Sequence, residues 1–113
     1  YYIALNNRGT AKLNMNDFAG AVSDFDAALK QKPNYTLAMN NMASVYIKKK
    51  DYKAASDWAT KAIQADAKLG AAYANRGIAK QMLKDEEGAC ADWKKAAEYG
   101  AAEGKRYTSG FCD

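Results

Sequence analysis

The sequence predicts an all-α protein built from three antiparallel helix hairpins and a closing helix. Alanine recurs along the whole chain, whereas valine and isoleucine, which favour strands, are few. Proline, which interrupts helices, occurs only at Pro33. The chain also repeats every 34 residues, as from Asn7 to Asn41 to Asn75, and this period is typical of stacked helical hairpins. At 113 residues, the chain has the size of one domain.

The repeat keeps its register over three units without insertion or deletion. A shift of 34 residues aligns five sets of identical or similarly small residues, which are Asn7, Asn41 and Asn75; Gly9, Ala43 and Gly77; Asp17, Asp51 and Asp85; Ala21, Ala55 and Ala89; and Ala28, Ala62 and Ala96. We therefore treat 1–113 as one domain with units at 2–35, 36–69 and 70–103. A capping helix follows at 104–113, and its helical pattern begins near 101.

Each unit holds two helical patterns separated by a polar corner. Asp17 stands at this corner in unit one, where its carboxylate can accept hydrogen bonds from the free N–H groups of the next helix. Pro33 cannot continue a helix and sharpens the turn into unit two. No strand is expected, and the expected helices are 2–15, 18–31, 36–49, 52–65, 70–83, 86–98 and 101–112.

Charged residues occur at facing positions of two hairpins. We expect Arg8 to pair with Asp24 in unit one, and Arg76 with Asp92 in unit three. Unit two has apolar residues at the same places, Met42 and Trp58. An anion site formed by the two arginines is the alternative interpretation.

Composition argues against catalysis, metal binding and nucleic-acid binding. The chain has no histidine, the commonest general base and zinc ligand, and we nominate no catalytic residue, metal ligand or cofactor. The net charge of +4 comes from dispersed lysines, which indicate a solvated surface rather than a nucleic-acid site. No apolar stretch approaches the ~20 residues that cross a bilayer. The chain begins at Tyr1, which favours a mature form or an excised segment.

The offsets of Gly9, Ala21, Phe25, Ala28 and Pro33 within the unit resemble the tetratricopeptide repeat, and the resemblance covers residues 2–103. It implies a right-handed α-solenoid whose first helices line a concave groove for extended or helical peptides. The segments NRGTAK and NRGIAK are similar to those of bacterial members. The implied peptide contacts are Asn6, Asn7, Thr10 and Leu13 in unit one, Leu37, Asn40, Asn41, Ser44 and Ile47 in unit two, and Asn75, Ile78 and Met82 in unit three.

Asn7, Asn41 and Asn75 resemble the asparagine ladder of O-linked N-acetylglucosamine transferase, where such side chains hold the peptide backbone. Asparagine at this place is also a common structural feature of the family, and both interpretations stay open.

Other members grip the acidic tails of heat-shock chaperones with a clamp of lysine, asparagine and arginine. The clamp positions here are Asn6, Thr10, Asn41, Ala71 and Asn75, of which only Asn41 matches. The resemblance therefore implies a protein or peptide partner with apolar side chains rather than an acidic tail. A scaffold that self-associates through its repeat ends is the alternative function.

The two cysteines, Cys90 and Cys112, belong to the second helix of unit three and to the closing helix, which should pack together. The segment GACADWKKA followed by a late cysteine resembles bacterial repeat proteins of exported type. This resemblance favours a disulfide and a periplasmic or secreted location. Two small buried thiols are the alternative.

Overall fold

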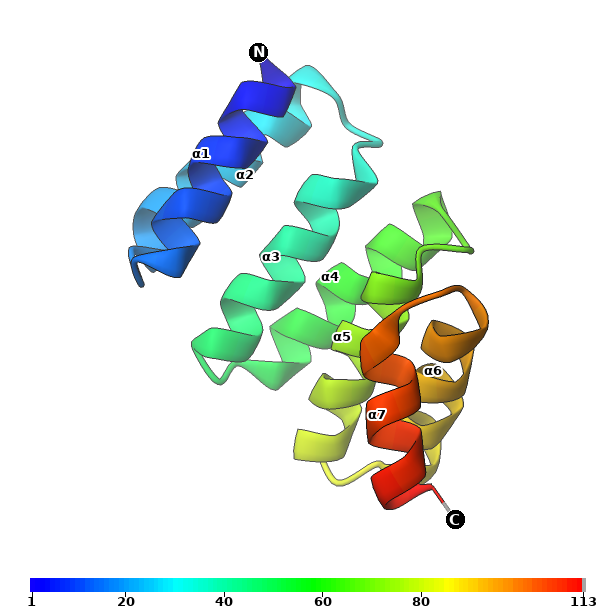
Figure 1. Cartoon of the computed structure of the whole chain (residues 1–113). Coiled ribbons are helices and arrows are strands. Elements are labelled where there is room, and N and C mark those ends of the chain that lie inside the picture. Colours follow the sequence, from blue (N-terminus) through cyan, green and yellow to red (C-terminus); the bar gives the residue numbers. More distant parts are fainter. Residues whose placement is uncertain (113) are drawn as a thin grey trace.

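The computed structural model describes residues 1–112, which form seven α-helices and no strand. The helices are α1 (Tyr2–Asn14), α2 (Phe18–Gln31), α3 (Thr36–Lys48), α4 (Tyr52–Ala65), α5 (Gly70–Met82), α6 (Glu86–Glu98) and α7 (Ala102–Phe111). Figure 1 shows α1 to α6 as three successive hairpins with α7 packed against α6. The molecule measures 43 × 25 × 20 Å, as expected of a short solenoid. The predicted fold class is confirmed.

The first helix of each hairpin ends one residue earlier than predicted, because a left-handed turn begins there. The residue two places beyond each helix has a positive φ, which is 62° at Asn16, 64° at Lys50 and 68° at Lys84. In the first turn, the N–H groups of Asn16 and Asp17 donate to the carbonyls of Leu13 and Lys12, at 2.9 and 2.8 Å. This paired arrangement satisfies carbonyls that the helix end leaves free.

The second helix of each hairpin begins at the predicted aspartate. The Asp17 carboxylate accepts a hydrogen bond from the N–H of Gly20 at 3.0 Å. The same cap, worth about 1 kcal/mol in typical helices, is repeated by Asp51 and Asp85.

Within a hairpin, residue size on one helix compensates for residue size on the other. A Cβ added to Gly9 would lie 2.6 Å from Cε1 of Phe25, so the ring occupies the space that a side chain would need. Trp93 lies against Gly77 in the same way in unit three. In unit two both positions hold alanine, Ala43 and Ala59, and both are fully buried. Each hairpin therefore packs closely, as the small residues predicted.

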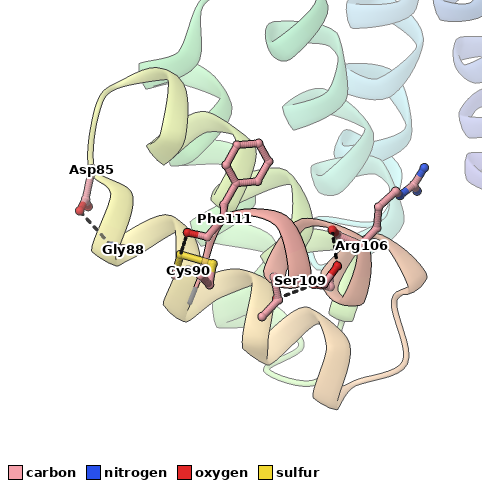
Figure 2. Close-up of a disulfide and its surroundings, with 9 residues drawn as sticks. Asp85, Gly88, Cys90, Arg106, Ser109 and Phe111 are labelled. Atoms are coloured by element: carbon pink, nitrogen blue, oxygen red, sulfur yellow. Dashed lines mark hydrogen bonds between the residues drawn. A yellow bond between two sulfur atoms is a disulfide. The ribbon is translucent and has the colours of Figure 1, made fainter.

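The closing helix α7 covers the open side of the third hairpin. Gly104 is buried, and a Cβ there would collide with the backbone of α6 at Trp93 and Ala97. Tyr107 stacks on Trp93 with ring centroids 5.0 Å apart. A disulfide joins Cys90 of α6 to Cys112, with Cα atoms 5.5 Å apart (Figure 2). These contacts fix both ends of α7, which begins at Ala102 and ends at Phe111, inside the predicted 101–112.

None of the helices in residues 1–112 has the length and the apolar character that crossing a membrane requires.

Candidate peptide-binding groove

The first helices of the three hairpins, α1, α3 and α5, lie in a row, because α1 contacts α3 and α3 contacts α5 (Figure 1). Helix α7 contacts α5 and extends this row by one more helix. The resemblance to tetratricopeptide repeats placed the candidate peptide contacts on this row.

Asparagine pairs join neighbouring first helices. The Asn41 side-chain N–H₂ donates to Oδ1 of Asn6 at 2.8 Å and to Thr10 Oγ1 at 3.4 Å. One unit later, the Asn75 side-chain N–H₂ donates to Oδ1 of Asn40 at 2.8 Å and to Ser44 Oγ at 3.1 Å. The same network therefore occurs twice, 34 residues apart, and it ties α1 to α3 and α3 to α5.

These hydrogen bonds leave some polar atoms of the asparagines free to bond with other groups. The Oδ1 atoms of Asn41 and Asn75 have no hydrogen-bond partner among the described residues, and neither do the N–H₂ groups of Asn6 and Asn40. None of these atoms is sealed from solvent, because the only such unpaired atom in residues 1–112 is Nε1 of Trp93. Each pair thus offers one acceptor and one donor in a fixed position.

The structural interpretation holds for two of the three asparagines and leaves the peptide-ladder interpretation possible. Asn41 and Asn75 are half-buried and have a structural role through their side-chain nitrogens, while their oxygens stay accessible. Asn7 is exposed and makes no such bond within the described part of the chain. Asn6 and Asn40, expected as open contacts, are largely buried partners of the network.

The apolar candidates divide into accessible and core residues. Leu37 and Met82 are about half exposed, at 48% and 51%. Ile47 and Ile78 are partly buried. Leu13 is only 6% exposed and packs with Phe25 and Met42 in the core, so the structure corrects its expected contact with a ligand.

The predicted charge pairs are present, and each includes a lysine that the sequence pattern did not assign. Arg8 donates to Asp24 through Nε at 2.9 Å and Nη2 at 2.7 Å, and Lys12 Nζ lies 3.2 Å from the same carboxylate. The hydrogen bonds from the Arg8 guanidinium lower the pKa of Asp24, while burial of the carboxyl acts in the opposite direction. Each arginine is thus neutralised by a buried carboxylate, which speaks against the alternative of an anion site.

The third hairpin repeats this arrangement around an equally buried carboxylate, but with a more deeply buried arginine. Arg76 donates to Asp92 through Nε and Nη2, both at 2.8 Å, and Lys80 Nζ lies 3.1 Å away. Only 20% of the Arg76 side chain is exposed, against 61% for Arg8. The difference arises because α4 packs on α5, where Arg76 also reaches Thr60 at 3.4 Å, whereas within the described chain no hairpin precedes α1.

One residue beside the candidate contacts was missed. A pocket of about 190 Å³ opens where α3, α5 and α7 meet, and its lining comprises Asn40, Ser44, Ala71, Ala74, Asn75, Ile78 and Glu103. The assigned unit boundary put Glu103 at the last position of unit three. The capping helix was assigned to 104–113 with a pattern beginning near 101, and no contact with a ligand was considered for its first turn, which in α7 carries Glu103. Among residues 1–112 we find no group of three or more His, Cys, Asp and Glu side chains arranged to hold a metal ion.

The family model of the tetratricopeptide repeat matches residues 13–76. The chain belongs to the tetratricopeptide-repeat family. Tetratricopeptide repeat protein 6 of Homo sapiens is 31% identical over 80 residues, which are 71% of this chain but only 15% of that protein.

Two solved structures show the same fold. The TPR domain of Sgt2 from Aspergillus fumigatus superposes with a TM-score of 0.91 at 23% identity, over 97% of this chain and 76% of that one. The second TPR domain of human RPAP3, solved in complex with the HSP70 peptide SGPTIEEVD, gives 0.86 at 22% identity, over 98% and 94%.

Proposed function

We propose that this protein is an interaction module that binds an extended or helical peptide segment in the row formed by α1, α3, α5 and α7. The observation that carries the proposal is the repeated asparagine pair. Hydrogen bonds between helices already fix the side-chain amides of Asn6, Asn40, Asn41 and Asn75. A peptide backbone that binds them would therefore not have to order these side chains, which lowers the entropy cost of binding. Leu37, Ile47, Ile78 and Met82 add apolar contacts beside them.

The peptide complex of RPAP3 supports this class of function, since its ligand is a short segment of another protein. The RPAP3 ligand SGPTIEEVD is acidic, but the clamp positions of this chain include no lysine or arginine. We therefore propose a ligand other than an acidic chaperone tail.

A random peptide library tests the proposal. Neighbouring helices lie about 10 Å apart, so a strand crossing four of them spans about nine residues. Blocked peptides of that length would be selected on the protein and then titrated by NMR. We expect the side-chain N–H₂ signals of Asn6 and Asn40 to shift, together with the amide of Leu37.

A matched pair of variants locates the surface. Leu37→Gln should weaken binding of the selected peptide, whereas Met15→Gln, which changes another exposed apolar residue at the first hairpin turn, should not. An empty selection, or shifts confined to residues outside the row, would refute the proposal.

Assembly through a repeat end is a second candidate, favoured by the face of the first hairpin that no other residue of 1–112 covers. Ala4 is exposed, whereas the equivalent residues Ala38 and Ala72 are fully buried beneath the preceding hairpin. A hollow at this face is lined by Tyr1, Ala4, Leu5, Arg8 and Gln31. We infer that a second copy of the chain could occupy this hollow.

Light scattering tests this assembly. The mass of the unaltered chain should rise with concentration, and the mass of Ala4→Glu should stay that of a monomer. A constant monomer mass of the unaltered chain excludes the assembly.

We further propose a bacterial source and an oxidising compartment, periplasmic or extracellular. The repeat motifs support the first proposal, and the Cys90–Cys112 bridge supports the second, since structural disulfides persist in such compartments. Mass spectrometry of protein alkylated in its native compartment tests this location: two freely alkylated thiols would contradict it.

A further inference from the structure

The pocket at the α7 end of the groove has a mixed lining. Ala71, Ala74 and Ile78 of α5 form its apolar part, and Asn75 contributes the accessible Oδ1 described above. On the other side stands Glu103, in the first turn of α7. Glu103 is the only charged residue among those lining the pocket, so the lining itself carries one negative charge.

The Glu103 carboxylate is exposed and forms no ion pair with any residue of 1–112. The positions on α5 beside it, Ala71 and Asn75, are those at which the clamp of related proteins carries positive charge, and both are neutral here. A cationic group in the pocket would therefore meet one negative charge and no competing lysine or arginine in the lining.

We propose that this pocket receives a lysine or arginine side chain of the peptide bound in the groove, an inference that rests on the function proposed above. Both side chains combine an aliphatic stem with a cationic head. The stem would lie on Ala71, Ala74 and Ile78, and the head would donate to Glu103 and to Oδ1 of Asn75. Glu103 would thus determine specificity in favour of basic segments.

The preference for a lysine or arginine side chain has to come from the local contact with Glu103. The protein carries a net charge of +4, so its overall field repels a basic peptide. An exposed ion pair changes an equilibrium constant by about two- to fivefold. We expect a preference of that size for lysine or arginine over glutamine at one peptide position, and we expect it to weaken at high salt.

The experiment uses a positional library of acetylated and amidated peptides, whose blocked ends carry no charge. The full chain and its Glu103→Gln, Glu103→Lys and Glu87→Gln variants would be compared by fluorescence binding. Glu87→Gln removes the same charge from an exposed site on α6 outside the pocket. Thermal melting by circular dichroism checks that α7 stays folded in each variant.

We expect Glu103→Gln to abolish the preference for basic residues and Glu103→Lys to reverse it toward glutamate, with Glu87→Gln behaving as the unaltered chain. Peptides that bind without a basic preference, or whose preference survives in Glu103→Gln, would overturn this inference and leave the groove proposal intact. A parallel titration uses the same peptides with free N-termini. Binding that depends on the free N-terminus and not on a lysine or arginine side chain would also overturn the inference, by assigning the pocket to a chain-end ammonium. If no peptide binds at all, both proposals fail.

Discussion

Replacing Arg76 by methionine should destabilise the protein strongly, and the same replacement at Arg8 should cost much less. Methionine retains the packing of the aliphatic stem, and the chain itself uses Met42 at the equivalent place. Asp92 would be left with only the Lys80 contact at 3.1 Å, in a site where its own side chain is 5% exposed.

The magnitude follows from the hydrogen bonds that Arg76 makes. Arg76 contributes two charge-assisted bonds of 2.8 Å to a buried carboxylate, and removing one partner of such a pair costs about 3–5 kcal/mol. Because Lys80 remains and some water can enter, we expect the free energy of unfolding to fall by about 2–4 kcal/mol. The Asp24 side chain is as buried as Asp92, at 4%, but its partner Arg8 is 61% exposed. Replacing Arg8 therefore lets water reach the carboxylate from the side that the guanidinium covered, and the decrease should be clearly smaller.

Urea unfolding followed by far-UV circular dichroism measures both effects. A decrease of about 2–4 kcal/mol corresponds to a midpoint lower by about 1–2 M for a chain of this size, at an unchanged slope. If Arg8→Met and Arg76→Met shift the midpoint equally, coverage by the preceding hairpin does not determine the cost. If Arg76→Met has no effect, the ion pair does not stabilise the fold.

Two further predictions concern the bridge and the charge pair of the first hairpin. The Cys90→Ser/Cys112→Ser variant should lose about 3 kcal/mol of unfolding free energy, because the bridge closes a loop with a sequence separation of 22. Reductant should lower the melting temperature of the unaltered chain and leave that of the variant unchanged. Equal melting temperatures of the two proteins without reductant would contradict this. Arg8 lowers the folded-state pKa of Asp24. The contribution of the ionised Asp24 to the free energy of unfolding should therefore be complete above about pH 4 and should decline as pH falls through the folded-state pKa. Urea midpoints across this range should fall less steeply for Asp24→Asn, and an equal slope would show that other carboxylates dominate.

The 34-residue period was sufficient to predict what happens inside a unit. The starts of the second helices follow from the aspartate caps, and the Arg–Asp pairs follow from charges at facing positions. Contacts between units were harder to predict from the period. For example, Asn41 donates a hydrogen bond to Asn6, which lies 35 residues earlier rather than 34. A shift by the period aligns equivalent residues, but the partner across two helices depends on how those helices cross.

The same limit explains Leu13 and Glu103. Helical spacing placed Leu13 on the groove side, but Leu13 shares a buried cluster with Met42 and Val45 of the next hairpin, a contact between units that the period does not give. Glu103 lay outside the assigned first helices, so no periodic pattern pointed to it. Its position depends on how α7 docks, which the sequence alone showed only as apolar residues on one face.

The position of Glu103 and the disulfide depend on opposite ends of α7. Glu103 lies beside Gly104, whose close approach to the α6 backbone holds the first turn of α7. The disulfide acts at the opposite end, beyond Phe111. A helix that loses one terminal anchor frays first from that end, so breaking the bridge should uncover Trp93 near Phe111 before it displaces Glu103. Under mild reduction, tryptophan fluorescence should therefore change while the proposed preference for basic peptides persists. If the fluorescence change and the loss of that preference occur together, the bridge holds the whole helix.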